Sequence, residues 1–275
     1  MNSKYTTFLI KTFDRPALCQ RLLDSINEIH PGAKVIVSDD SRKHTDFDFG
    51  SLDAIHQRHE YDIGLSEGRN RAVLACDTRY MVLLDDDMIM RPSSIERMQS
   101  RLRDLRCDIM CGHVQGYNRA HVFGRFREYQ HEDLRGVSMV FGAQHKWTKR
   151  AVQADYGLNF FVAKTDSVKK VMWDPRIKIA HEHCDFFYRA AVAGLKVYSA
   201  PDCTIDHPKE RRTRAYKQKR VVRKHRFQYA MLENMGADSF SHKRGRKFGH
   251  INNGRGVSFP WQKVEEGQWI FGQSV

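Results

Sequence analysis

The chain has 275 residues, with hydrophobic (41%) and charged (29%) fractions typical of a folded globular protein. These values exclude a wholly disordered chain. No apolar run approaches the roughly 20 residues that a membrane helix needs, and the start of the chain lacks the basic and apolar segments of a secretion signal. We therefore expect a soluble, cytoplasmic protein without a transmembrane segment.

The net charge of +13 is concentrated in one part of the chain. Between His207 and Gly249 there are fourteen Lys and Arg residues and only three acids, so the remainder is nearly neutral. One strongly cationic segment on a nearly neutral body is typical of a protein that meets a polyanion. Nucleic acid and an anionic membrane surface are the two candidates.

The first half of the chain alternates strand and helix patterns. A β-rich run at 5–11 precedes Pro16, which opens a helix whose apolar residues keep helical spacing up to Ile29. Further strands are predicted at 35–37, 54–59 and 80–84, and further helices at 64–75, with Ser66 as its cap, and at 93–105. This order predicts an α/β fold with a mainly parallel sheet, which binds ligands at the carboxyl ends of its strands.

The alternation is interrupted after residue 115. Residues 116–150 gather glycines, aromatics and histidines, which predict an irregular insertion with one hairpin. Strands are then predicted at 158–163 and 195–199, and helices at 165–172, 184–193 and, within the basic segment, about 212–235. The aromatic residues near the carboxyl end are interpreted as a strap on the body; they are Phe259, Trp261, Trp269 and Phe271.

The six cysteines are scattered, so we expect reduced thiols. Cys107, Cys111 and His113 are the one candidate zinc cluster. Because the paired Cys-x-x-Cys spacing is missing and the surrounding residues are typical of a short buried strand, a structural zinc is the less favoured interpretation.

Three consecutive carboxylates, Asp85, Asp86 and Asp87, directly follow the apolar strand at 80–84. Adjacent carboxylates repel one another unless a cation or a solvated turn relieves the repulsion. Because these residues end a buried strand, we expect a divalent cation, Mg²⁺ or Mn²⁺, shared with the oxygens of a diphosphate. The alternative is a polar turn that binds no ligand.

The motifs around this triplet resemble those of glycosyltransferase family 2. Asp85-x-Asp87 after an apolar strand resembles the D-x-D motif of glycosyltransferases with the GT-A fold. Motifs similar to the family's others occur in the same order, at residues 11–16, 35–41, 64–70, 159–163, 182–187 and 206–207. The similarity is greatest to the catalytic domain of the ganglioside β-1,4-N-acetylgalactosaminyltransferases and covers about residues 7–207.

The resemblance implies a GT-A catalytic domain at 1–207, with 116–150 as an insertion, followed by a basic, helical carboxyl-terminal extension at 208–275. It also implies a UDP-sugar donor, bound by Thr12, Asp14, Arg15, Asp39, Asp40, Arg69, Asn70, Asp85 and Asp86. Solvated turns for the two aspartates at 39 and 40, and a helix-start salt bridge for Arg69 and Asn70, are the structural alternatives.

The resemblance implies that Asp87, Asp85 and His207 hold the metal. Mixed carboxylate and imidazole ligation suits Mn²⁺ better than Mg²⁺. A structural role for His207 is the alternative.

The region from Glu182 to Phe187 is similar to the family segment that supplies the catalytic base. A carboxylate there would take the proton of the acceptor hydroxyl as its oxygen attacks the anomeric carbon, and inversion would follow. His183 stands where many members of the family have an aspartate. The resemblance to the ganglioside-type enzymes favours Asp185 as the base, with Glu182 second and a helix-capping acid as the structural alternative.

We expect the basic extension to bind the acceptor substrate. Its candidate polyanion-binding residues are Arg211, Arg212, Arg214, Lys217, Lys219, Arg220, Arg223 and Lys224. Phosphate neutralisation by such residues, with aromatic rings nearby to stack an exposed base, favours a nucleic-acid acceptor, best a hydroxymethylated base in viral DNA. A membrane-associated glycan or glycolipid is the alternative, since cationic segments also bind anionic membranes.

Two other function classes remain open from the sequence. In a non-enzymatic nucleic-acid-binding protein the acidic triplet would be a turn. In a nucleotidyltransferase of a related fold the product would be pyrophosphate.

Overall fold

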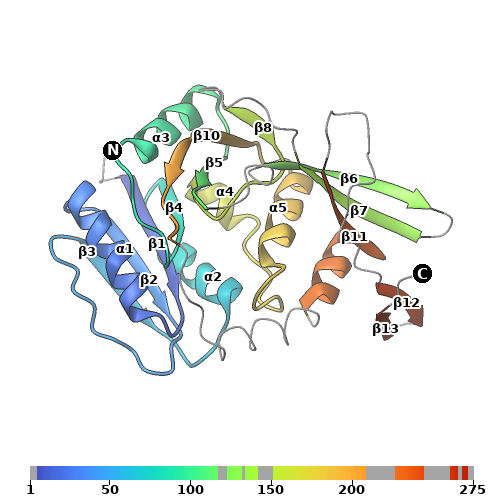
Figure 1. Ribbon diagram of the computed structural model, residues 1–275, viewed down its shortest axis with the longest axis horizontal. Helices are drawn as coiled ribbons and strands as arrows, with labels where there is room; N and C mark the ends of the chain where they lie inside the picture. Colours follow the sequence, from blue (N-terminus) through green and yellow to red (C-terminus); the bar gives the residue numbers. More distant parts are fainter. Residues whose placement is uncertain are drawn as a thin grey trace.

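An eight-stranded sheet, in the order β3-β2-β1-β4-β9-β5-β10-β8, organises the computed structural model (Figure 1). The described residues are 5–116, 123–131, 134–141, 151–208, 227–244, 261–265 and 268–271. The strands of the sheet are β1 (Thr6–Thr12), β2 (Lys34–Asp39), β3 (Asp53–Arg58), β4 (Tyr80–Asp85), β5 (Ile109–Val114), β8 (Val152–Ala154), β9 (Phe161–Lys164) and β10 (Val197–Ile205). Strands β8 and β9 run antiparallel to their neighbours, and the other neighbouring pairs are parallel. The predicted α/β class is confirmed.

Helices cover both faces of this sheet because side chains alternate along each strand. In β4, Met81 and Leu83 join one buried cluster, and Val82 and Leu84 join the other. Helices α2 (Leu65–Ala75), α4 (Thr165–Lys169) and α5 (Glu182–Val192) contribute to the first cluster, and α1 (Pro16–Ile29) and α3 (Ser94–Asp104) to the second.

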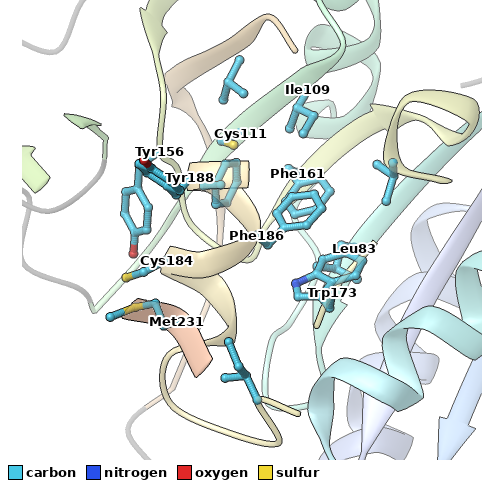
Figure 2. Packing of buried hydrophobic residues seen from close by; sticks show 14 of the residues in the cluster. Leu83, Ile109, Cys111, Tyr156, Phe161, Trp173, Cys184, Phe186, Tyr188 and Met231 are labelled. Atoms are coloured by element: carbon cyan, nitrogen blue, oxygen red, sulfur yellow. The ribbon is translucent and has the colours of Figure 1, made fainter. Parts of the chain in front are cut away.

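The packing of α5 fixes the position of its first turn. Phe186 is fully buried and stacks on Trp173, with ring centroids 4.3 Å apart, and on Phe161 of β9, 6.2 Å away (Figure 2). Stacked aromatic rings bury large areas in a defined orientation. Helix α5 is therefore anchored against the sheet next to β4.

The strand register gathers the polar strand ends at one edge. Thr12 of β1 is opposite Asp39 of β2, and Lys11 is opposite Asp85 of β4. Beyond β10, Asp206 exchanges two backbone hydrogen bonds with Ile89, of 2.9 and 3.0 Å. The chain after β10 thus lies beside the chain after β4.

A second, three-stranded sheet extends from the main one. The predicted hairpin in the insertion is confirmed as β6 (Gly124–His131) and β7 (Leu134–Phe141), and β11 (Ser239–Arg244) pairs parallel with β7 (Figure 1). Strands β12 (Trp261–Glu265) and β13 (Gln268–Phe271) form an antiparallel pair within the predicted strap. The packing of that strap on the body stays a prediction.

Two details of the predicted helices were wrong. Gly64, not Ser66, precedes α2, because the Gly64 backbone adopts φ 99° and its N–H donates to Asp40 Oδ2 at 2.9 Å. Ser66 lies inside the helix and donates to the Ile177 carbonyl at 2.5 Å. Helix α4 ends at Lys169, shorter than the predicted 165–172.

Residues 227–235 are helical, and the rest of the helix predicted over 212–235 lies outside the described residues. Met231 and Leu232 are fully buried in the same cluster as α5. The domain boundary after residue 207 stays a prediction, but this helix of the carboxyl-terminal segment shares its core with the main sheet.

None of the helices within the described ranges has the length and apolar character needed to cross a bilayer. The six cysteines are buried with free thiols. Cys107, Cys111 and His113 do not form a metal-ligand group, and no group of three or more possible ligands occurs in the described part of the chain.

Removing the Leu232 side chain tests the shared core. Leu232→Ala is expected to lower the free energy of unfolding by about 2–5 kcal/mol, measured by urea denaturation, because it opens a cavity in the main core. The matched control is Glu233→Ala, which removes an exposed ion pair with Arg176 and is expected to cost at most about 1 kcal/mol. Equal effects of the two substitutions would show that 227–235 is not part of that core.

Candidate active site

The acidic triplet forms a tip at the carboxyl end of β4, held by the start of the chain. Thr12 Oγ1 donates to Asp86 Oδ2 at 2.8 Å. The Arg15 guanidinium forms ion pairs with both Asp86 and Asp87, the latter at 2.7 Å. These contacts bring Thr12 and Arg15 to the triplet, as the predicted donor site requires.

The two carboxylates under Arg15 differ in burial. Asp86 is fully buried, and loss of hydration raises its pKa to about 6 against the opposing charge of Arg15. Burial alone would raise the pKa of Asp87, but the hydrogen bond with His207 and the charge of Arg15 hold it well below its usual range. Asp87 therefore stays ionised at neutral pH and is less deeply buried than Asp86.

Asp87 and His207 converge as a pair. The distance from His207 Nε2 to Asp87 Oδ1 is 3.3 Å, and the hydrogen bond with Asp87 raises the pKa of His207. A carboxylate and an imidazole fit Mn²⁺, which accepts mixed oxygen and nitrogen ligands. Two protein ligands leave positions for diphosphate oxygens and water. The Asp87 and His207 side chains therefore fit the metal as ligands. Asp85, the third predicted ligand, contacts Arg69 and Asn159 instead.

Asp85 is linked to α5 through Arg69. The fully buried Arg69 guanidinium donates to Asp85 Oδ1 at 2.9 Å and to Glu182 Oε1 at 3.4 Å. Asn159 Nδ2 donates to the other Asp85 oxygen at 3.4 Å. A single arginine thus joins the acidic tip to the carboxylate that begins α5.

Asp39, at the end of β2, is held by several hydrogen-bond partners. It accepts hydrogen bonds from the Ser41 backbone at 2.9 Å and contacts His44 and His56 at 3.2 and 3.3 Å. Burial would raise the pKa of Asp39, but the hydrogen bonds from His56, Ser41 and His44 lower it below its usual range. Asp39 therefore remains an anion with a fixed orientation. These are the properties needed to accept hydrogen bonds from a nucleoside hydroxyl or amide, the role predicted for Asp39.

The structure gives two other predicted donor ligands internal partners. Asp40 pairs with the buried Lys11 and accepts from Gly64, which fixes the start of α2. Asn70 exchanges two hydrogen bonds of 2.8 Å with the backbone of Trp173. The polar atoms of both side chains have partners inside the protein, and the donor-binding roles of Asp40 and Asn70 stay predictions.

Asp14 lies at the surface of the same edge with φ 52°. Its N–H donates to Ser41 Oγ, and its carboxylate accepts from the Arg42 N–H at 3.0 Å. Asp14 therefore ties the loop after β1 to the loop after β2.

The two candidate bases have different surroundings. Asp185 is fully buried; Arg189 donates twice to Oδ2, at 2.9 and 2.7 Å, and Asn234 donates to Oδ1 at 2.7 Å. Glu182 faces Arg69, and its Oε2 is buried without a hydrogen-bond partner among the described residues. The geometry favours Glu182, whereas the sequence favoured Asp185.

His183 is an uncharged imidazole in an aromatic setting. Its ring meets Tyr156 at 4.9 Å and Phe187 at 5.1 Å, both edge to face. Burial, with the nearby charge of Arg69, lowers the pKa of His183 to about 3. At neutral pH this ring cannot serve as a charged group, and its low pKa makes it a weak base.

The structure adds four residues to the site that sequence reasoning left without a role. They are Lys11, His44, His56 and Asn159. Lys11 and Asn159 fall within the motifs at 11–16 and 159–163, whereas the sequence carried no signal for His44, in the loop after β2, or for His56, inside β3. The predicted basic residues between Arg211 and Lys224 lie outside the described residues.

The chain is similar in sequence to known glycosyltransferases. The family model described as "Glycosyl transferase family 2" matches residues 7–171. Human Beta-1,4 N-acetylgalactosaminyltransferase 1 is 28% identical over 213 residues, which cover 74% of this chain and 39% of that protein. Mouse Beta-1,4 N-acetylgalactosaminyltransferase 2 is 27% identical over 216 residues, with 73% and 39% covered. The chain spans about two fifths of the length of these relatives.

Solved structures share the fold. GalNAc-T7, solved with UDP, GalNAc and Mn²⁺, superposes with a TM-score of 0.57 at 14% identity, covering 75% of this chain and 44% of the other. S. aureus TarS superposes with a TM-score of 0.53 at 12% identity, covering 82% and 43%. The predicted GT-A fold is confirmed. The nucleic-acid acceptor finds no support in these matches, which favour the glycan alternative.

The buried, neutral His183 predicts a specific pH dependence. Below pH 6.5 the unfolded chain binds a proton on this residue and the folded protein does not, so stability falls as the pH falls from 6.5 toward 3. Between pH 8 and pH 5 the loss attributable to His183 is about 2 kcal/mol, measured by urea denaturation. His183→Phe is expected to remove this part of the pH dependence, and an unchanged dependence would contradict the assignment.

Proposed function

Because the chain belongs to glycosyl transferase family 2, we propose that it transfers a sugar from a UDP-sugar to a hydroxyl group of a glycan, with inversion at the anomeric carbon. The observation that carries the proposal is the Arg69 bridge between Asp85 and Glu182. Through this bridge the Glu182 carboxylate lies close to the acidic tip, which supports a role for Glu182 as the base in transfer from a donor bound there.

The proposed donor lies along the carboxyl edge of β1, β2 and β4. Asp39, held by two histidines, reads the nucleoside, and Thr12 and Arg15 line the path to the diphosphate. N-acetylgalactosamine is the first sugar to test, since the relatives named above carry it in their names.

Asp87 and His207 are the proposed metal ligands, with Asp85 behind them. Bound Mn²⁺ or Mg²⁺ would offset the charge of the departing diphosphate. A metal is part of the proposal because the Asp87 carboxylate and the His207 imidazole converge at the acidic tip.

Glu182 is the proposed base. Its Oε2 accepts the proton of the acceptor hydroxyl as that oxygen bonds to the anomeric carbon, and the bond from the anomeric carbon to the diphosphate oxygen breaks with its electron pair. Arg69 holds the other oxygen and so orients the carboxylate. Because Asp185 uses both oxygens internally, its proposed role is to fix α5 through Arg189.

The proposed acceptor is the hydroxyl of a sugar. A β-1,4 linkage, as in the names of the relatives, is made to oxygen 4 of a sugar ring. The basic segment after residue 207 then suits an anionic membrane surface that carries the glycan. The cytoplasmic location expected from the sequence stays a prediction.

Two matched substitutions distinguish the candidate bases. Glu182→Gln is expected to lower kcat at least about 100-fold while the affinity for UDP changes little, because only the proton acceptor is lost. Asp185→Asn is expected to lower thermal stability through its lost pairing with Arg189, and the protein that remains folded should keep kcat within about tenfold. The reverse pattern, with kcat lost only in Asp185→Asn, would restore Asp185 as the base.

The reaction itself is tested by UDP release from a panel of UDP-sugars, with Mn²⁺ and with one of three acceptors. We expect release to increase with a galactose-terminated glycolipid in anionic vesicles, and to remain at the level of hydrolysis with hydroxymethylated duplex DNA or with plain DNA. Stimulation by the hydroxymethylated DNA alone would contradict the glycan acceptor. Release of pyrophosphate in place of UDP would identify a nucleotidyltransferase.

A further inference from the structure

Buried polar atoms without partners gather around Arg69, which joins Asp85 to the start of α5. Asn159 Oδ1, Glu182 Oε2 and His183 Nδ1 are all buried and have no hydrogen-bond partner within the part of the chain that is described. We call Arg69, Asn159, Glu182 and His183 the polar wall. Because unsatisfied buried polar atoms are rare in native proteins, a set of three in one place requires an explanation.

The loop at 156–160 links the members of the polar wall. Tyr156 packs on the His183 ring, and the backbone of Gly157 forms a hydrogen bond with the other ring nitrogen. Gly157 is required there because a Cβ atom would lie 2.2 Å from Cys111 Sγ. Two residues further on, Asn159 contacts Asp85. The loop at 156–160 therefore connects the acidic tip with the first turn of α5.

The chemistry of the partners fixes what each open atom can do. A carboxylate only accepts, so Asn159 must turn its amide nitrogen to Asp85 and leave Oδ1 as an acceptor. His183 Nδ1 has no partner among the described residues, and the backbone of Gly157 is a partner of the ring, so in the neutral ring Nε2 donates to the Gly157 carbonyl and Nδ1 keeps its lone pair. The open atoms of Asn159, Glu182 and His183 thus accept hydrogen bonds, and Arg69 Nε, also buried without a partner among the described residues, is an open donor of the wall.

We infer that Asn159 Oδ1 and His183 Nδ1 accept hydrogen bonds from hydroxyl groups of the transferred sugar, beside the Glu182 carboxylate. The inference rests on the proposed function, in which the sugar lies between the diphosphate at the acidic tip and the base on the opposite face. Asn159 contacts Asp85 at the acidic tip, and His183 directly follows the proposed base Glu182. The two residues therefore lie at the two ends of the position proposed for the sugar.

This arrangement has a consequence for specificity. Asn159 Oδ1 and His183 Nδ1 can each bind a sugar hydroxyl but not a hydrogen or fluorine at the same carbon, because neither substituent can donate a hydrogen bond. The protein thus recognises two sugar hydroxyls, one through Asn159 of the loop at 156–160 and one through His183 of α5.

The test compares the affinities for UDP and for UDP-N-acetylgalactosamine, measured by titration calorimetry with Mn²⁺. Asn159→Leu and His183→Phe keep the side-chain size and remove the acceptor. Each substitution is expected to change the affinity for UDP by no more than about twofold and to lower the affinity for UDP-N-acetylgalactosamine about tenfold. Deoxyfluoro analogues of the donor sugar should weaken binding to the unmodified protein, and each variant should become insensitive to the analogue changed at its own hydroxyl.

Ser199→Ala is the matched control, since Ser199 Oγ is also buried without a partner among the described residues but lies in β10, within the sheet. It is expected to change neither affinity. Equal losses for UDP and for the sugar nucleotide in both wall variants, or no loss in either, would overturn the inference. No binding of UDP by the unmodified protein would instead contradict the proposed function, so the two failures are distinguishable.

Discussion

Three consecutive carboxylates at the end of a buried strand require positive charge around them, and this requirement shapes the whole site. Asp86 is fully buried, and its neighbours Asp85 and Asp87 are only partly hydrated. Arg15 compensates Asp86 and Asp87, and Arg69 compensates Asp85. Removing either arginine would leave a buried carboxylate uncompensated, which is strongly destabilising. The charges therefore stabilise the site and determine its geometry together.

The same contacts connect parts of the chain that are far apart in sequence. Arg15 comes from the loop before α1, Arg69 from α2, and His207 from the chain after β10. Each reaches the triplet because parallel strands end at one edge of the sheet. Arg69 also extends to Glu182, so α5 is aligned with the tip by charge as well as by the aromatic packing of Phe186. Fold and catalytic arrangement thus depend on one electrostatic network.

The sequence predicted the features that depend on local pattern. Short β-rich and apolar runs and the Pro16 start signal predicted β1, α1 and β4 within one or two residues, and the ordered motifs around the acidic triplet indicated the family. It did not predict partners that come from elsewhere in the chain. The choice between Glu182 and Asp185 depends on Asn234, 49 residues after Asp185 in sequence, and the internal role of Asn70 depends on the backbone of Trp173. The pairing of β11 with β7 is equally non-local.

The most direct test of the cation at the acidic tip is nuclear magnetic resonance of the histidine side chains during titration with Mn²⁺ in the presence of UDP. Paramagnetic Mn²⁺ broadens signals of nearby nuclei, so the His207 signals should disappear first, while those of His30, which pairs with Glu96 instead, should persist. A protein that binds UDP and Mn²⁺ together while the His207 signals remain sharp would contradict the account.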